Sequence, residues 1–237
     1  MTFSIVARCP QTGELGMAVA SASLACAAST VNVRAGVGAV ASQASGNRFY
    51  GPDSLRLLAE GTVPAEVVAR VTAGDPAREM RQLLIVDTSG NCAGFTGSSC
   101  LNQAGHLIRQ DYVVGGNRLA DGVLDAMSEA FDAAAGEDLT ERLLRALEAG
   151  DSAGGELGGR QSAGIKVSAD PDYSIFDLRV DDHATPVSEL RRLVGLRRES
   201  RRGDEVFRPT REQPVPPGFL EKWPEIKRAY EEADARS

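Results

Sequence analysis

The stretch TFSIVARCPQTGELGMAVAS, residues 2–21, decides the fold. It holds two runs rich in β-forming residues, 2–8 and 15–21, separated by the turn-forming connector CPQTGE at 9–14. Side chains of a strand alternate between its two faces, so Phe3, Ile5 and Ala7 would face one way and Thr2, Ser4 and Val6 the other. The stretch therefore predicts a β-hairpin.

Further turn and helix signals follow this hairpin along the chain. Residues 37–43 form a strand candidate built mostly of small side chains, which lets another layer approach the backbone closely. Proline near the start of 52–60 and of 64–73 predicts two short helices. The remaining predicted elements are a hairpin of 81–87 and 91–97, helices at 121–135 (with an Asp121 cap) and 139–149, strands at 161–168 and 175–181, and a helix at 186–199.

The order of these elements predicts an α+β fold. Neighbouring strands are joined by short turns, so the sheets should be largely antiparallel. Helix pairs fall between the hairpins, which suggests sheets covered by helices on their outer faces. We therefore expect a four-layer αββα sandwich of two largely antiparallel sheets.

Composition divides the chain into a domain at 1–199 and a tail at 200–237. The segment 200–218 is charged and proline-rich, which is typical of an extended tail. An apolar stripe then runs along a short predicted helix and consists of Phe219, Trp223, Ile226 and Tyr230. This stripe would either pack back on the domain or reach a neighbouring subunit, so a homo-oligomer formed through the tail stays open.

Charge and hydropathy exclude several classes of protein. The net charge of −7 over 237 residues argues against a polybasic nucleic-acid binder, and we interpret the arginines near 191–202 as a solvated surface. No apolar run approaches the ~20 residues that span a bilayer, and the start of the chain shows no secretory signal. We expect a cytoplasmic protein with no membrane and no nucleic-acid partner.

The cysteines and histidines do not suggest a metal centre. Four cysteines stand without a CxxC pair, and His106 lies far from His183 in the chain. Cysteines in such a context are more often reduced apolar side chains than zinc ligands or disulfides. We therefore expect neither a metal site nor a cofactor.

The dipeptide Met1-Thr2 is the feature that most directly suggests chemistry. A small second residue permits removal of the initiator methionine, after which the chain would begin at Thr2. That residue would carry a hydroxyl and a free α-amine, whose ordinary pKa is about 7.7–8.0. The amine can accept the hydroxyl proton and so activate a nucleophile. Because Thr2 opens a predicted strand, the amine would be held rigidly.

Several motifs together resemble the DUF1028 family, whose fold is similar to that of N-terminal-nucleophile (Ntn) hydrolases. They are the opening 2–21, GVGAVASQAS at 36–45, GGN at 115–117, GGRQSAG at 158–164, and DLRVDDH at 177–183 followed by PVSELRRL. The resemblance covers about residues 2–198 in order. It implies the αββα sandwich that the element order also predicts, and it implies no known substrate.

The resemblance implies nucleophilic acyl transfer, in which Thr2 attacks the carbonyl of a small amide. Asn117, in an expected Gly115-Gly116-Asn117 turn, is the candidate for stabilising the oxyanion or positioning the amine. An Asn that stabilises a turn is the alternative interpretation. Gln43 ends the small-residue strand and would place an amide in the same cleft, or else make an ordinary strand-end hydrogen bond.

Four further residues are candidates for binding the substrate. Arg160 and Gln161 follow a glycine-rich loop, where an arginine could hold a substrate carboxylate or simply be solvated. Asp182 and His183 belong to the densest ionisable cluster, and His183 would serve either proton transfer or capping of a strand-to-helix junction.

Two other functions remain open at this stage. A non-catalytic ligand-binding or scaffold protein could use the same sandwich. A cysteine-dependent enzyme using Cys9 or Cys26 would need a partner base, which the sequence spacing does not offer. The Ntn hypothesis also has to account for the absence of lysine before Lys166.

Overall fold

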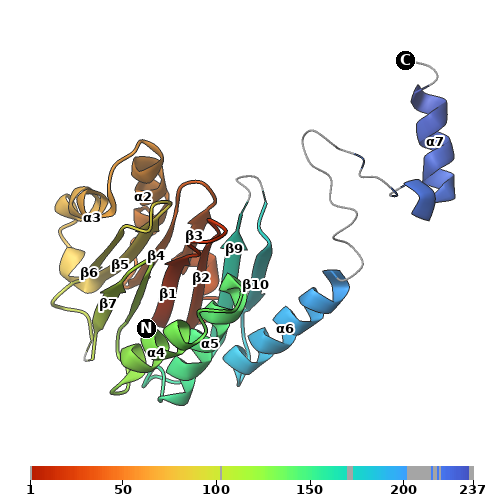
Figure 1. Cartoon of the computed structure of the whole chain (residues 1–237). Helices are drawn as coiled ribbons and strands as arrows, with labels where there is room; N and C mark the ends of the chain where they lie inside the picture. The colour runs from red at the N-terminus through yellow and green to blue at the C-terminus, as the bar shows by residue number, and fades with distance from the viewer. Residues whose placement is uncertain are drawn as a thin grey trace. The chain divides into compact units, whose positions relative to one another are not determined.

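A computed structural model of the chain describes residues 2–101, 103–169, 173–201, 215, 218 and 220–234. Met1, whose removal the sequence permits, lies outside these residues. The chain divides into two compact units, Met1–Arg192 and Leu193–Ser237. The first unit carries both sheets (Figure 1).

The larger sheet has six strands in the order β10-β9-β2-β1-β8-β7, and every neighbouring pair is antiparallel. Its strands are β1 (Thr2–Arg8), β2 (Leu15–Ser21), β7 (Gly105–Arg109), β8 (Tyr112–Gly116), β9 (Ser162–Ser168) and β10 (Phe176–Val180). The predicted hairpin β1–β2 forms the centre of this sheet. Its connector closes with a hydrogen bond of 2.8 Å from the Cys9 N–H to the Glu14 carbonyl.

The smaller sheet has four antiparallel strands in the order β3-β4-β5-β6. These are β3 (Val31–Arg34), β4 (Gly38–Ala44), β5 (Arg81–Asp87) and β6 (Cys92–Thr96). The first unit also contains α1 (Ala27–Thr30), α2 (Tyr50–Ala59), α3 (Pro64–Ala73), the 3₁₀ turn η1 (Arg78–Met80), α4 (Val123–Ala133) and α5 (Leu139–Ser152). Helix α6 (Pro186–Arg201) crosses the boundary between the two units.

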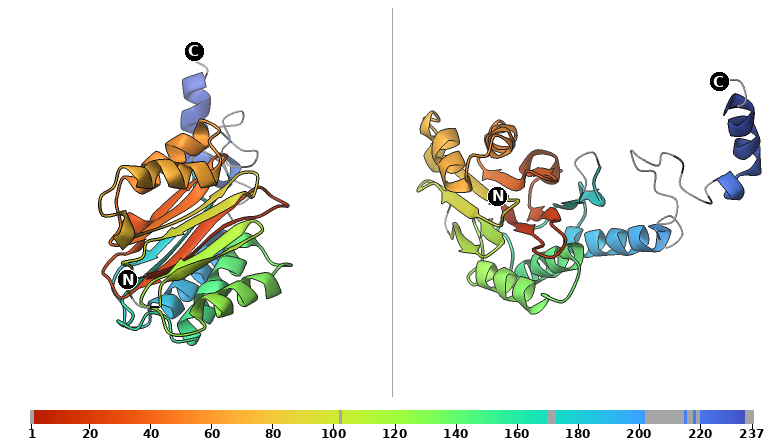
Figure 2. Two further views of the ribbon diagram at one scale, coloured as in Figure 1. Left: turned by 90° about the vertical axis from the view of Figure 1, so that its left-hand side faces the viewer. Right: turned by 45° about the horizontal axis from the view of Figure 1, so that its top comes forward.

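The two sheets pack against each other, and the helices lie outside them. Strands β1 and β2 contact β4, while β5 contacts β1 and β8. Helix α5 packs on β1, β2 and β9, whereas α2 packs on β3 and β4 and α3 packs on β5 and β6. Figure 2 shows α2 and α3 on one side of the strands and α4 and α5 on the other.

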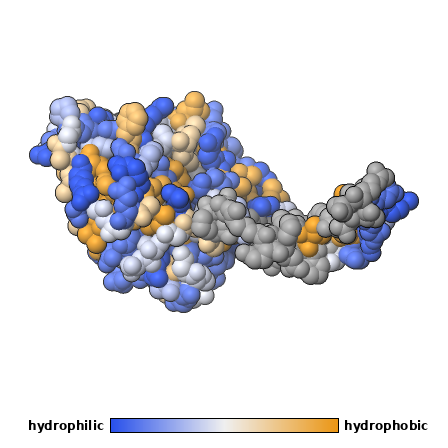
Figure 3. All heavy atoms as spheres, turned by 90° about the horizontal axis from the view of Figure 1, so that it is seen from above, coloured by the Kyte–Doolittle hydropathy of each residue, from blue (hydrophilic) through white to orange (hydrophobic). Residues whose placement is uncertain are grey.

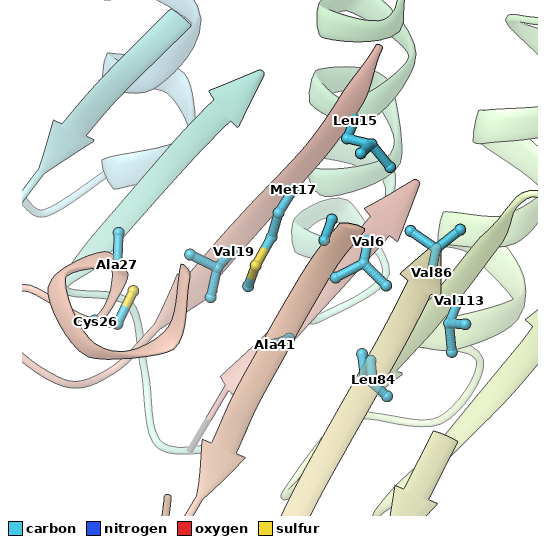
Figure 4. Close-up of a cluster of buried hydrophobic side chains, with 11 residues drawn as sticks. Val6, Leu15, Met17, Val19, Cys26, Ala27, Ala41, Leu84, Val86 and Val113 are labelled. Atoms are coloured by element: carbon cyan, nitrogen blue, oxygen red, sulfur yellow. The ribbon is translucent and has the colours of Figure 1, made fainter. Parts of the chain in front are cut away.

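Side chains from both sheets fill the space between them. Val6, Met17 and Val19 of the larger sheet meet Leu84 and Val86 of the smaller one in a single buried cluster (Figure 4). Phe3 belongs to the opposite face of β1, because a Cβ placed on Gly150 of α5 would lie 3.1 Å from its ring. The alternation predicted for β1 is therefore present, with one face toward the other sheet and one toward the helices.

The α+β class and the two antiparallel sheets are confirmed. Helix α3 spans the predicted 64–73, and β1, β2 and β5 also have their predicted bounds. Two details are wrong. Asp121 does not cap α4, since Gly122 with φ +78° is its N-cap residue; the capping side chain instead occurs at α5, where Asp138 accepts from the Glu141 N–H at 2.9 Å.

The expected turn at Gly115-Gly116-Asn117 is the second error. Gly115 and Gly116 end β8 and pair with Ser4 and Phe3 of β1. A Cβ on Gly115 would lie 2.7 Å from Leu84 of the facing sheet. Glycine here permits close approach of two layers and does not mark a turn.

Exposed large apolar side chains of the first unit are scattered over several elements; among them are Leu24, Phe49, Val63, Met80 and Leu101. On the face drawn in Figure 3, hydrophobic and hydrophilic residues are mixed in small groups. Within the described ranges, no helix is long and apolar enough to cross a membrane.

In the second unit, the structure describes a 3₁₀ turn η3 (Leu220–Lys222) and helix α7 (Pro224–Asp234). Trp223 and Ile226 of the predicted stripe are 44% and 46% exposed. Phe219 and most of the proline-rich segment 200–218 lie outside the described residues, as does the side chain of Tyr230. The division at 199 and the role of the tail stay predictions.

Candidate functional site

A polar cavity of about 240 Å³ opens at the start of β1. Its lining comes from β1, the end of β2, the segment through α1, and the end of β4 with the loop that follows. The lining residues are Thr2, Ser21, Ser23, Leu24, Cys26, Ser29, Thr30, Ser42, Gln43, Ala44, Gly46, Asn47 and Arg48. Hydroxyl groups dominate this surface, and Arg48 is the only side chain with a formal charge among these described lining residues.

Thr2 is held in place from both sides by neighbouring strands. It pairs with Ser21 of β2, and its hydroxyl donates to the Ser21 Oγ at 3.2 Å. Its carbonyl accepts from the N–H of Asn117, just beyond β8, at 3.0 Å. Thr2 is 6% exposed. The first described residue of the chain therefore lines the cavity, and its hydroxyl is bonded to Ser21, another lining residue.

A buried network of amide side chains lies between the sheets behind Thr2. The Ser4 hydroxyl donates to the Gln43 Oε1 at 2.7 Å, and the Gln43 Nε2 donates to the Gln82 Oε1 at 2.8 Å. The same Gln82 oxygen accepts from the Asn117 Nδ2 at 3.1 Å. Gln43 is 3%, Asn117 1% and Gln82 0% exposed. Such a network fixes the orientation of each amide, because its members hydrogen-bond one another in a buried site.

Gln82 extends the network to the edge where the two sheets meet. Its Nε2 donates to the Gly105 and Gly116 carbonyls and to the Thr96 Oγ1, each at 2.9 Å. Thr96 in turn bonds the His106 Nδ1 at 2.8 Å. Burial lowers the pKa of His106, which favours its neutral form. The network thus joins β1, β4, β5, β6 and β7.

Glu156 is a buried carboxylate beside the same end of β2. Its Oε2 accepts from the Ala22 N–H at 2.7 Å, whereas its Oε1 is buried without a hydrogen-bond partner. Burial raises the pKa of this carboxyl, while the Ala22 N–H and the Arg118 charge act in the opposite direction. Leu119, two residues beyond Asn117, forms a β-bridge with Glu156.

The cavity does not favour thiol chemistry. Burial raises the pKa of Cys26, the cysteine that lines the cavity, to about 11, so the thiol is protonated at neutral pH. A nucleophilic cysteine needs a thiolate. All four cysteines are free. Within the described ranges, no group of three or more His, Cys, Asp or Glu side chains could hold a metal ion.

The structure brings three of the predicted site residues together, since Thr2 and Gln43 line the cavity and Asn117 bonds Thr2. The other four predicted residues, Arg160, Gln161, Asp182 and His183, are not among the residues that line the cavity. Arg160 is ion-paired with Asp151 of α5 and also donates to the Asp151 carbonyl at 2.8 Å. A role of these four predicted residues in substrate binding stays a prediction.

Gln161, Asp182 and His183 form a separate surface group. The Gln161 Nε2 donates to the Asp182 carboxylate at 3.1 Å, and the His183 Nδ1 accepts from the Thr185 N–H at 3.0 Å. The latter bond ties the His183 side chain to the backbone just before α6. The Gln161 N–H donates to the Ser21 carbonyl at 2.9 Å, so this group adjoins the cavity through the backbone.

Sequence reasoning missed Ser21, Gln82, Glu156 and Arg48. Ser21 had an accessible signal, because a hydroxyl at the end of the strand paired with β1 must lie opposite Thr2. Gln82 lies one residue inside a predicted strand and gave no local signal. Glu156 and Arg48 lie in loops, whose course the sequence did not specify.

Comparisons with known proteins place this α+β protein with its hydroxyl-lined cavity in a family. Residues 2–190 match DUF1028, a family of unknown function, and the chain belongs to that family. It is similar to the crystal structure of protein SPO2555 from Silicibacter pomeroyi, a DUF1028 protein. The two are 37% identical with a TM-score of 0.75, over 82% of this chain and 85% of the other.

A second solved structure is less similar. Anbu (ancestral beta-subunit) from Yersinia bercovieri has 14% identity and a TM-score of 0.40, over 85% of this chain and 97% of that chain. A search of the curated proteins found no match.

Proposed function

We propose that the protein is an N-terminal-nucleophile hydrolase with the four-layer αββα sandwich of that class, and that it cleaves a small amide. The observation that carries the proposal is the position of Thr2, whose hydroxyl lies on the wall of a polar cavity. The packing of helices outside two facing sheets supports the same assignment.

Removal of Met1 would make Thr2 the N-terminal residue. Its α-amine would then lie on the same residue as the hydroxyl, within reach directly or through one water. The Asn117 backbone N–H donates to the Thr2 carbonyl, and on the other side of β1 Thr2 pairs with Ser21 of β2. A nucleophile held in this way has little rotational freedom to lose when a substrate binds.

The reaction would proceed in two steps. The Thr2 Oγ1 attacks the amide carbonyl carbon, the hydroxyl proton passes to the α-amine, and the amine delivers a proton to the leaving nitrogen as the C–N bond breaks. Water then attacks the resulting ester, the acyl group leaves as an acid, and the Thr2 hydroxyl is restored. Atoms and charges balance in both steps without a metal or a redox partner.

Gln43 would act as a positioning residue, whereas Asn117 would contact the reaction centre. The Gln43 Nε2 donates both to Gln82 and to the Gly115 carbonyl at 3.3 Å, which occupies both of its N–H groups. The Asn117 Nδ2 donates only to Gln82, which leaves one N–H for the amine or the oxyanion. This difference favours Asn117 over Gln43 as the residue that meets the reaction centre.

The test uses intact mass and a β-lactone acylating probe. We expect purified protein to lack Met1 and to gain one acyl group on Thr2. Thr2→Ser should keep the adduct and Thr2→Ala should lose it. Ser29→Ala, which removes another hydroxyl of the cavity, should still be acylated. Retained Met1, or an adduct that persists in Thr2→Ala, would contradict the proposal.

The same experiment addresses the alternative of a ligand-binding or scaffold protein. Such a protein would form no acyl adduct, and ligand binding would survive Thr2→Ala unchanged. The buried amide network would then serve rigidity alone.

A further inference from the structure

The charge distribution around the cavity points to the chemical class of its ligand. The chain carries a net charge of −7. No carboxylate is present among the described residues that line the cavity, and Arg48 supplies a single positive charge at the loop after β4. A cation alone among hydroxyl and amide groups favours an anionic ligand.

The Arg48 guanidinium is available to bind a ligand. Among the described residues, no ion pair or hydrogen bond engages this group, and Arg48 is exposed and lines the cavity. By contrast, Arg56 of the following helix pairs with Glu60 at 3.0 Å. A guanidinium presents several donors in a planar fork that matches a carboxylate.

The loop on either side of Arg48 is fixed by one carboxylate. The Asn47 Nδ2 donates to the Asp75 Oδ2 at 3.2 Å, and the Tyr50 hydroxyl donates to the same oxygen at 2.9 Å. Asp75 also accepts from the Ala77 N–H and from Arg81, and these bonds hold its pKa well below the ordinary value. The carboxylate therefore stays ionised and keeps the loop in place at neutral pH.

A further bond ties this loop to the cavity wall, where the Ser42 hydroxyl donates to the Asn47 carbonyl at 2.9 Å. Ser42 precedes Gln43 in β4, and both line the cavity together with Thr2. Arg48 is thus presented from an ordered loop on the same cavity as the Thr2 hydroxyl. Preorganisation of this kind lowers the cost of ordering a long side chain on binding.

We propose that the cavity binds a small amide that carries a carboxylate, with Arg48 as the residue that binds the carboxylate and Thr2 facing the amide. The volume of about 240 Å³ suits a ligand of few heavy atoms, and one cation matches one negative charge. This inference rests on the proposed function for the orientation of the amide, but the carboxylate-binding role of Arg48 stands without turnover.

The test measures binding by calorimetry to the Thr2→Ala protein, in which turnover cannot occur. The probes are N-acetylglycinate and the neutral N-acetylglycinamide, which are matched in size. We expect the carboxylate probe to bind about tenfold more tightly or better. Arg48→Gln should abolish that preference, while Arg56→Gln should keep it. Thermal unfolding should be the same for both variants, because both side chains are exposed.

Equal affinity for the two probes would overturn the inference, as would a preference that survives in Arg48→Gln. Failure of the carboxylate probe to bind at millimolar concentration would also overturn it. None of these results bears on acylation of Thr2, so failure of the inference is distinguishable from failure of the proposed function. Conversely, an unacylated Thr2 with a preference that depends on Arg48 would identify a carboxylate-binding protein.

Discussion

At the residue scale, Glu156 is a buried carboxylate that lacks a full set of hydrogen-bond donors. It is 3% exposed, and only one of its two carboxylate oxygens has a hydrogen-bond donor within the described region. Removing a carboxylate from water favours its protonated form. The raised pKa of Glu156 therefore couples the stability of the first unit to pH.

The sign of this coupling gives a prediction for Glu156→Gln. A raised pKa in the folded state stabilises the fold below the ordinary pKa, and this contribution is lost as the pH rises through the folded-state value. The amide cannot ionise. We therefore expect the free energy of unfolding of Glu156→Gln to increase relative to that of the unmodified protein as the pH rises from acid toward neutral. Urea unfolding at several pH values measures the difference.

Glu129→Gln provides the matched control, since Glu129 is exposed on α4. Its effect on the free energy of unfolding should be small throughout, within the ±0.5 kcal/mol typical of surface substitutions. If Glu156→Gln instead loses stability relative to the unmodified protein as the pH rises, the Ala22 N–H and the Arg118 charge outweigh burial, and the argument from burial is wrong.

At the element scale, glycines determine how closely the layers approach. Gly164 of β9 lies against α1, where a Cβ would overlap the Cβ of Ala27 and lie 3.3 Å from the Leu178 carbonyl. Neither atom belongs to the flexible end of a side chain. Since Ser29 and Thr30 of α1 line the cavity, the same contact also positions part of the candidate site.

Gly164→Ala should therefore be destabilising, by roughly 1–3 kcal/mol, as is typical of an overpacked interior. It should also weaken binding at the cavity by displacing α1. Gly74→Ala is the matched control, because a Cβ there meets nothing within 4 Å and the backbone φ is −92°. Chemical denaturation would measure both, and an equal midpoint for the two variants would contradict the packing argument.

Short length and glycine content account for the strands that the sequence did not reveal. Residues 31–34, 105–109 and 112–116 were not predicted to be strands, although they form β3, β7 and β8. Strand β3 is only four residues long, and glycine begins β7 and ends β8. Local propensity interprets such glycines as turns, whereas at Gly115 of β8 the facing sheet requires a residue without a side chain.

At the scale of the whole molecule, the second unit carries the prediction of self-association. Trp223, just before α7, and Ile226 within it are nearly half exposed, so this segment retains apolar surface that a partner could cover.

Arg191 and Arg192, at the end of the first unit, have carboxylate partners. Arg191 pairs with Glu141 and Glu148, and Arg192 pairs with Glu189. These partners suit the interpretation of that stretch as a solvated, ion-paired surface.

The single tryptophan makes self-association through α7 measurable. We expect light scattering to give a mass above the 25.0 kDa of one chain, and tryptophan emission to shift to shorter wavelength as protein concentration rises. Ile226→Asp should abolish both effects, because a charge in an apolar contact is costly. Glu225→Gln, an exposed change on the same helix, should preserve them. A mass of one chain at all concentrations would contradict the prediction.

The sequence by itself determined the hairpin of residues 2–21 and the antiparallel α+β class. These follow from alternation, turn residues and composition, which are local properties of the chain. Only the tertiary structure decided that Gln82 joins Gln43 to Asn117, that Glu156 is buried beside β2, and that Arg48 faces the cavity. Those residues meet through contacts between distant segments, and a buried polar group gains its partners only when the sheets have packed.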